Sequence, residues 1–386
     1  MQLQGIKVVE FGANLAGPFC GQILADLGAE VIKIERPSGD DCRQWGPPFI
    51  DESSVNFVAI NRGKRSAVVD LDDEAQRQAL IALIGAADVY LHNMRAGVME
   101  KFGLDGKAML ARFPRLVYAD VSAFGHVGPL AKKPGYEPLL QAFSGLISVN
   151  GDPSGPPARL GASVIDYGTG MWTAIGILAA LVERARSGKG CIVNTSLFET
   201  ALMWMSTHVA SYTASGKLPQ RQGTGHASLT PYQAFETANG PLMVTPGNDR
   251  LWARFCQVLG RPEWPTDPRF VDNKSRAAHR EELVGMIQQI MQGDTKENWA
   301  ARLDAAGVPG GPINRVDEVL AESQTQALGI LDRSVDGRTA FTHAPVSFDG
   351  KRAASQGGAP RIGQQTASVL PAGAVEKAKK TPKPKA

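Results

Sequence analysis

Asp166 is the residue whose type and position best suit it to covalent chemistry. It follows the apolar pair Val164 and Ile165 and precedes a Tyr-Gly-Thr-Gly segment and a long apolar run, so we expect it at or just before a helix N-terminus. One interpretation is that it only caps the helix. The free amides and the dipole of a helix start would also keep a partly desolvated carboxylate ionised, so Asp166 could instead be a nucleophile.

Two glycines favour the second interpretation. Gly168 and Gly170 fall in the first turn of the predicted helix, where glycine weakens helical structure. Such residues are useful where another group must approach the backbone closely.

Basic residues recur after successive predicted strands. They are Arg36, Lys64, Arg65, Arg95, Lys101, Lys132 and Lys133. Many such charges are simply solvated, but a crevice that collects them would suit a polyphosphate ligand. The sequence has no GxxxxGK[ST] and no GxSxG, which excludes a P-loop and does not support a hydrolase elbow. The six histidines and four cysteines lack the spacing of a metal site or a disulfide framework.

The first half of the chain alternates strand and helix patterns. Strands are expected at residues 6–11, 31–34, 66–71, 88–91, 116–121 and 191–196, and helices at 19–27, 72–87 (capped by Asp72) and 166–187. This alternation predicts a doubly wound, mostly parallel sheet with ligand sites at the carboxyl ends of its strands. Glu35 lies where a ribose-binding acid would, but the first turn, GANLAGPFCG, lacks the GxGxxG of a dinucleotide site.

The pattern changes after about Gly223, where short strands and an amphipathic stretch at 280–291 predict a smaller α+β domain. We expect a large α/β domain at residues 1–200, a linker at 201–224, the small domain at 225–310, and a linker with a return to the large domain at 311–370. Residues 371–386 are dominated by Lys and Pro and are expected to be disordered.

Composition narrows the class of protein. The 386 residues are 43% hydrophobic and 20% charged, as in a globular protein of two or three domains. The net charge of +3 argues against a nucleic-acid partner. No secretory signal is recognisable, and the most apolar stretch, 171–182, is shorter than the ~18 residues of a membrane span. We therefore expect a cytoplasmic protein without membrane contacts.

Many segments, in order, resemble the family III CoA-transferases, the group of formyl-CoA:oxalate and carnitine CoA-transferases that is related to α-methylacyl-CoA racemases. They run from about Ile6 to Val346 and include LAGPFCGQILADLGAEVIKIERPSGDD, NRGKRSAVVDLDD, NMRAGVMEKFGL, FGHVGPLAKKPGYEPLLQAFSGL, IDYGTG, TPYQAF, PGNDRLW and GVPGGPINRVDEVL. The resemblance implies a Rossmann-like, CoA-binding large domain, a smaller α+β domain and an interlocked-ring homodimer. It implies no metal and no cofactor beyond CoA as substrate.

The resemblance also implies residue roles. Asp166 matches the catalytic aspartate, which attacks the donor thioester and carries the reaction through an aspartyl anhydride and an aspartyl-CoA thioester to the acceptor carboxylate. The positions implied to contact CoA are Arg36, Lys64, Asn93, Met94, Val98 and Lys101.

Tyr136 bears on the choice between transfer and racemisation. It stands 30 residues before Asp166, where the racemases carry a histidine and the transferases a tyrosine. A phenol with an ordinary pKa of about 10 is a poor partner for two-base proton exchange at neutral pH. We therefore expect a transferase. The alternatives are an α-methylacyl-CoA epimerase and a catalytically silent CoA-binding or scaffold protein.

Some departures and likenesses bear on the substrate. Leu15 stands where some members have a glutamine that helps to hold the acyl group, and Pro246–Asp249 replaces the glycine run that closes over the intermediate in the formyl-type enzyme. This replacement argues against oxalate as the acceptor. The phrases DDCRQWGPPF and GTGHASLTPYQAF look more like the succinyl-CoA:dicarboxylate branch, where Arg43 or another basic residue could neutralise a distal carboxylate.

Overall fold

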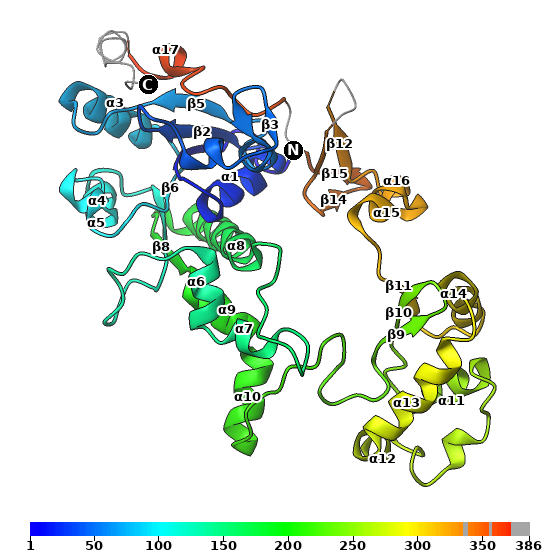
Figure 1. Ribbon diagram of the computed structural model, residues 1–386. Coiled ribbons are helices and arrows are strands. Elements are labelled where there is room, and N and C mark those ends of the chain that lie inside the picture. Colours follow the sequence, from blue (N-terminus) through cyan, green and yellow to red (C-terminus); the bar gives the residue numbers. More distant parts are fainter. Residues whose placement is uncertain (335–338, 355–356, 372–386) are drawn as a thin grey trace. The chain divides into compact units, whose positions relative to one another are not determined.

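The computed structural model describes residues 1–334, 339–354 and 357–371, which form two compact units (Figure 1). Unit 1 contains Met1–Leu146, Leu160–Ala210 and the described residues from Gln326 onward, and unit 2 contains Ile147–Arg159 and Ser211–Thr325. The interval expected as a linker, 201–224, is helical up to Ser215. The basic tail after residue 371 lies outside the described residues.

Unit 1 is built on a six-stranded parallel sheet, which confirms the predicted sheet. Its strands are β1 (Lys7–Phe11), β2 (Glu30–Glu35), β5 (Arg65–Val68), β6 (Val89–His92), β7 (Val117–Ser122) and β8 (Ile192–Ser196), in the spatial order β5-β2-β1-β6-β7-β8. The order reverses between β1 and β6. At such a switch point the loops leave the sheet in opposite directions and open a crevice at the carboxyl ends of the strands.

Helices cover both faces of the sheet, because successive strand residues point to opposite sides. Val8 belongs to the buried cluster on the side of α1 (Ala16–Asp26) and α8 (Val164–Ser187), and its neighbour Val9 to the cluster beneath α3 (Glu74–Gly85) and α5 (Gly106–Arg112). The elements that follow the strand ends are thereby fixed around one edge of the sheet.

The remaining elements of unit 1 are short. They are the 3₁₀ turn Asp41–Gln44, β3 (Phe49–Ile50), β4 (Ser53–Ser54), α2 (Val55–Ala59), α4 (Val98–Lys101), α6 (Glu137–Phe143), α9 (Leu197–Trp204), β12 (Leu331–Arg333), β13 (Ala340–Thr342), β14 (Ser347–Phe348), β15 (Lys351–Arg352) and α17 (Thr366–Val369). Helices α7 (Leu146–Val149), α10 (Ser206–Ser215) and α16 (Ser323–Ala327) lie where the chain passes between the units.

Unit 2 combines an antiparallel sheet of order β11-β10-β9 with helices. The strands are β9 (Gln233–Thr237), β10 (Gly240–Val244) and β11 (Gly310–Pro312); the helices are α11 (Asp249–Val258), α12 (Asn273–Ala278), α13 (Arg280–Met291), α14 (Lys296–Ala305) and α15 (Val316–Ala321), with the 3₁₀ turn Trp264–Thr266. Its core includes Trp252, Phe255, Ile287 and Trp299. The amphipathic helix predicted at 280–291 is confirmed.

The predicted cap at Asp72 is wrong, and of the two interpretations of Asp166 the structure excludes the helix cap. The side chain of Asp73, not Asp72, accepts hydrogen bonds from the amides of Ala75 and Gln76 and caps α3. Helix α8 begins two residues before Asp166, so this residue lies within the first turn and does not cap it. Gly188, in the left-handed region with φ 74°, ends α8 as its position predicted.

Gly168 and Gly170 were expected to allow another group to approach the backbone of α8 closely. The groups that approach are neighbouring helices. A Cβ on Gly170 would lie 2.8 Å from the carbonyl oxygen of Ala16 and 3.1 Å from the amide nitrogen of Cys20, both on α1. A Cβ on Gly168 would lie 2.6 Å from Trp204 Cζ2 on α9. These glycines therefore let α1 and α9 pack against the first turn that carries Asp166.

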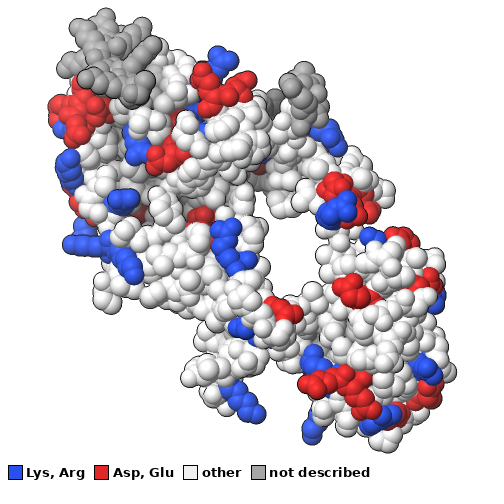
Figure 2. Space-filling view, viewed as in Figure 1, with Lys and Arg blue, Asp and Glu red and all other residues white. Residues whose placement is uncertain are grey.

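Helix α8 is long and apolar enough to cross a membrane by length and composition alone. Its buried residues, among them Ile165, Ala174 and Ile177, pack in the cluster shared with α1 and the sheet, as in the core helix of a globular unit. On the face shown in Figure 2, Lys and Arg side chains are interspersed with Asp and Glu and with wide uncharged areas.

Candidate active site

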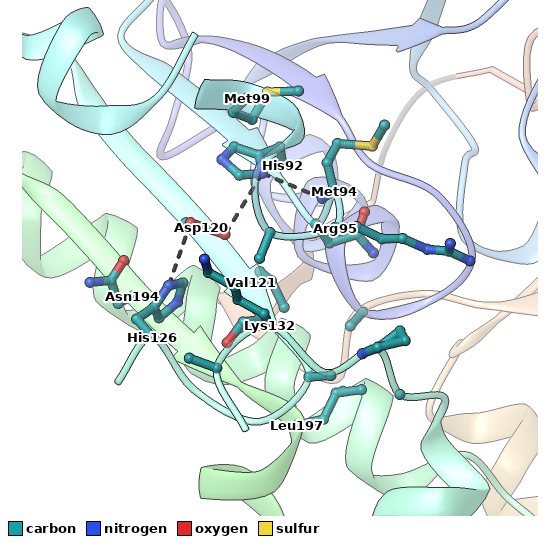
Figure 3. A pocket seen from close by; sticks show the side chains of 18 of the residues that line it. His92, Met94, Arg95, Met99, Asp120, Val121, His126, Lys132, Asn194 and Leu197 are labelled. Carbon is teal, nitrogen blue, oxygen red and sulfur yellow. Dashed lines mark hydrogen bonds and ion pairs between the residues drawn. The ribbon is translucent and has the colours of Figure 1, made fainter. Parts of the chain in front are cut away.

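A cavity of about 760 Å³ opens at the carboxyl edge of the sheet, beside the switch point. Its walls come from the loop after β1, the residues that follow β6 and β7, the segment before α6 and the first turn of α8. All of its lining residues belong to unit 1. A volume of roughly 300–1,000 Å³ is usual for small-molecule sites. Figure 3 shows a close view of this cavity.

Asp166 presents its carboxyl group to this cavity from the first turn of α8. Burial, and secondly the negative charge of Glu137, raise the pKa of Asp166 to about 7. Burial thus outweighs the expected stabilisation of the charge by the helix start. The carboxyl group of Asp166 makes no hydrogen bond or ion pair with any residue that the structure describes.

Glu137 is a second cavity carboxylate, one that the sequence interpretation did not single out. It is the first residue of α6 and is buried, with 4% of its surface exposed. Its Oε1 accepts a hydrogen bond from Gln141 Nε2 at 2.6 Å, while Oε2 has no partner among the described residues. Because no donor of the described chain neutralises this buried oxygen, its negative charge acts on the other groups of the cavity.

Asn93 fixes the loop that brings Leu15 to the cavity wall. Its side-chain Oδ1 accepts from the Ala13 amide at 2.8 Å, and its Nδ2 donates to the Ala13 carbonyl at 2.7 Å. The next residue, Asn14, adopts a left-handed φ of 66° and donates its amide to Asp40. The side-chain amide of Asn93 therefore joins the β1 and β6 loops across the switch point.

The structure brings together eight of the residues singled out from the sequence, three of them from the predicted basic crevice. The cavity is lined by Leu15, Asn93, Met94, Arg95, Lys132, Lys133, Tyr136 and Asp166. Arg36, Lys64, Val98 and Lys101 do not line it. Arg36 is exposed and pairs with Asp41, and the exposed Lys101 lies 3.4 Å from Asp72. Val98 packs against the core beneath α4.

Lys64 occupies the interior and not a ligand-facing position. Its Nζ lies 2.7 Å from Glu10 Oε2, and it also donates to the Pro18 carbonyl and to Asn61. Burial lowers the pKa of Lys64 to about 8. All three of its hydrogen-bond donors are used within the protein, so the structure does not place it as the CoA contact that the resemblance implied.

Further polar residues of the cavity were missed from the sequence. His92 ends β6, Asp120 and Asn194 occupy the same row on β7 and β8, and His126 follows β7. His92 and His126 follow predicted strands, which was the available signal, whereas Asp120 and Asn194 lie within the predicted strands 116–121 and 191–196. Only the register of the sheet shows that His92, Asp120 and Asn194 meet. Among the described residues, no group of His, Cys, Asp and Glu could hold a metal ion.

The comparisons with known proteins cover nearly the whole chain. Residues 3–366 match the model of the family described as CoA-transferase family III. An acetyl-CoA:oxalate CoA-transferase from Acetobacter aceti is 37% identical, over 95% of this chain and 94% of the relative, and a succinate–glutarate CoA-transferase from Agrobacterium fabrum is 35% identical with the same coverage. The crystal structure of a CAIB/BAIF family protein from Brucella suis has a TM-score of 0.85 and 36% identity, and the match covers 95% of this chain and 98% of that one. The chain therefore belongs to CoA-transferase family III.

Proposed function

We propose that this CoA-transferase moves CoA from an acyl-CoA, with succinyl-CoA as the first donor to test, to a dicarboxylic acid. The observation that carries the proposal is the unpaired carboxyl group of Asp166 in a cavity beside the switch point. The donor and acceptor class are supported by relatives named for succinate and glutarate at 35% identity and for D-citramalate at 35%. Oxalate, in the name of another relative, is also a dicarboxylate.

The transfer proceeds on Asp166 in steps that conserve charge. One carboxylate oxygen attacks the thioester carbonyl, the C–S bond breaks, and an anhydride and CoA thiolate form. The thiolate then attacks the aspartyl carbonyl of the anhydride, which releases the donor acid and leaves an aspartyl-CoA thioester. The acceptor carboxylate attacks the carbonyl of this thioester, the C–S bond breaks, and a second anhydride and CoA thiolate form. Thiolate attack on the acceptor acyl carbon then yields the new acyl-CoA and regenerates Asp166.

The raised pKa of Asp166 suits this role. A carboxylate whose pKa is about 7 is more basic than an ordinary aspartate, and it is still largely ionised slightly above neutrality. Its anhydride and thioester keep the acyl group activated for the next exchange. The reaction needs no proton acceptor at the substrate α-carbon, which agrees with a tyrosine at position 136.

Trapping of the intermediate tests the assignment. Incubation with succinyl-CoA and hydroxylamine should convert Asp166 to a hydroxamate that peptide mass spectrometry detects, and Asp166→Asn should lose both the adduct and at least about 10³-fold in transfer rate. Glu183→Gln, which removes an exposed carboxylate near the far end of α8, is the matched control. An active Asp166→Asn enzyme would overturn the proposal.

Isotope exchange separates transfer from epimerisation. A transferase should move labelled acid into the thioester pool only when both substrates are present. An α-methylacyl-CoA epimerase would instead exchange the α-hydrogen in D₂O without an acceptor acid. A panel of acyl-CoA donors and mono- and dicarboxylic acids, read by mass spectrometry, would then identify the acid pair.

We further propose that the active form is a homodimer, interlocked as in the family that the chain resembles. The exposed side of α8 carries Met171, Ile175 and Val182, which are 48%, 52% and 67% exposed. Apolar area of this extent on one helix is usually covered by a partner. Light scattering should give twice the 41.1 kDa of one chain. We also propose that this dimer is located in the cytoplasm.

A further inference from the structure

A row of polar side chains crosses the sheet at the carboxyl edge of three neighbouring strands. In the register, His92 of β6 pairs with Asp120 of β7, which in turn pairs with Asn194 of β8. Side chains of directly paired residues lie on the same face, so these three are neighbours in space. All three line the cavity that Asp166 faces. Figure 3 shows His92 and His126 on either side of Asp120.

The hydrogen bonds of His92 fix where its proton lies. The Tyr118 hydroxyl donates its single hydrogen to the Leu104 carbonyl at 3.0 Å, because a carbonyl can only accept. His92 Nε2, 2.6 Å from that hydroxyl oxygen, must then be the donor. Burial lowers the pKa of His92 to about 3, so the ring is neutral and its Nδ1 carries a lone pair, which accepts the Met94 amide at 3.4 Å. His92 therefore has no proton to donate to Asp120.

Asp120 is consequently a carboxyl group with unused acceptor capacity. Its Oδ1 faces the lone pair of His92 Nδ1 at 3.7 Å, and its Oδ2 lies 3.5 Å from His126 Nδ1. No Lys or Arg of the described chain forms an ion pair with it. The side chain is 27% exposed, and that exposure is to the cavity it lines. This carboxyl group lacks a strong hydrogen-bond donor within the part of the chain that the structure describes. It can therefore accept a hydrogen bond from an N–H or O–H group of a bound ligand.

The chemistry of a CoA thioester decides which of its parts suits Asp120. The phosphates are anionic, and a carboxylate would repel them in a partly buried site. The acceptor acid is anionic as well, and its carboxylate must reach Asp166. The pantetheine arm that connects the nucleotide to the sulfur is neutral and offers amide N–H and hydroxyl donors. A charged acceptor such as Asp120 makes its strongest hydrogen bonds with donors of this kind.

We propose that Asp120 is a substrate-contact residue that accepts a hydrogen bond from an N–H or O–H group of the pantetheine arm. The inference rests on the proposed function for the identity of the substrate. The neutral His92 holds the Met94 backbone and the Tyr118 hydroxyl and leaves the carboxyl group open. The second carboxyl oxygen of Asp120 lies 3.5 Å from His126 Nδ1. Asp120 thus anchors the arm while its thioester end lies at Asp166.

Shortened donors test the contact. Asp120→Ala should lower kcat/KM about ten- to a hundredfold, and by similar factors for succinyl-CoA and for succinyl-pantetheine, which lacks the nucleotide. The KM of the acceptor acid should not change. Asp120→Asn keeps an acceptor oxygen and should recover part of the loss, which separates the contact from a defect in folding. Glu183→Gln serves again as the control.

Two results would overturn the inference: a loss confined to succinyl-CoA, which would place Asp120 at the phosphates, or a loss confined to the acid. Calorimetric binding of CoA and of pantetheine gives a readout that does not depend on turnover. If the wild-type chain transfers nothing, the proposed function fails, yet weaker binding of both ligands by Asp120→Ala would still support the contact. Unchanged binding and turnover in that variant would refute the contact alone.

Discussion

Glu137 holds a negative charge close enough to Asp166 to help raise the pKa of the proposed nucleophile to about 7. The two carboxyl groups line one cavity but come from different helices, α6 and α8. Glu137 is tied to Gln141, whereas Asp166 has no partner in the described chain. One carboxylate is thus held in place as a fixed charge, and the other is left free to react.

This pairing predicts the pH dependence of the reaction. In the proposed mechanism Asp166 attacks as the carboxylate, so kcat/KM for the acyl-CoA should rise with pH through about 7 and then level off. Glu137→Gln removes the neighbouring charge, so the midpoint of this rise should move toward lower pH, by up to about one unit. The measurement is a pH–rate profile of both proteins. The amide of the new glutamine can keep the contact with Gln141, so the fold should be retained.

Glu183→Gln removes a carboxylate remote from the cavity and provides the reference profile. An unchanged midpoint in Glu137→Gln would mean that burial alone sets the pKa of Asp166. A midpoint that moved toward higher pH would contradict the assigned direction of the charge effect.

The same raised pKa means that Asp166 should lower the free energy of unfolding at high pH. The folded state holds the proton up to about pH 7, whereas the unfolded chain releases it near pH 4, so the free energy of unfolding falls as the pH rises between these values. Asp166→Asn removes this dependence. At pH 8 the variant should be more stable, by about 1–2 kcal/mol after allowance for solvent screening, and at pH 4 about equal. Urea unfolding at both pH values measures the difference.

An Asp166→Asn variant that is no more stable than the wild type at either pH would show that the carboxyl group is better solvated than its surroundings indicate. The expected gain would accompany a loss of transfer activity, which is the usual trade-off at an active site.

The sequence predicted the framework of the site better than its polar details. The parallel sheet followed from alternating apolar runs, and Asp166 from its place before a long apolar helix and from the resemblance. The row of His92, Asp120 and Asn194 depends on the register between neighbouring strands. The pattern of each strand taken alone does not predict that register. The burial of Lys64 depends on Glu10, 54 residues away in the chain. Local patterns cannot show that two such charges meet.

Lys64 should therefore be needed for stability. With Lys33, it shares the carboxylate of Glu10, whose Oε2 would lie 1.8 Å from a Cβ on Gly21, so this glycine makes room for the buried carboxylate beneath α1. Lys64→Met leaves the buried carboxylate of Glu10 with Lys33 as its one remaining cation among the described residues, which should lower the free energy of unfolding by up to about 3–5 kcal/mol. Chemical denaturation measures the change.

The double variant Glu10→Gln with Lys64→Met removes both partners and should regain part of this stability, because no buried carboxylate that has lost a cation remains at that position. A Lys64→Met protein with native stability but weakened CoA binding would instead support the ligand contact that the resemblance implied.

Gly170 should link helix packing to the reactivity of Asp166. An added methyl group would meet the Ala16 carbonyl at 2.8 Å and the Cys20 amide at 3.1 Å, and backbone atoms cannot swing aside as a side chain can. Gly170→Ala should therefore push the first turn of α8 away from α1, lower the free energy of unfolding by about 1–3 kcal/mol, and reduce kcat because the carboxyl group shifts.

Gly285→Ala on α13 is the matched control, since nothing lies within 4 Å of its added methyl group. That change should leave kcat unaltered and stabilise the helix by up to about 1 kcal/mol. Because Ala is the better helix former at both positions, a stabilised and fully active Gly170→Ala would show that α1 does not hold the turn that carries Asp166.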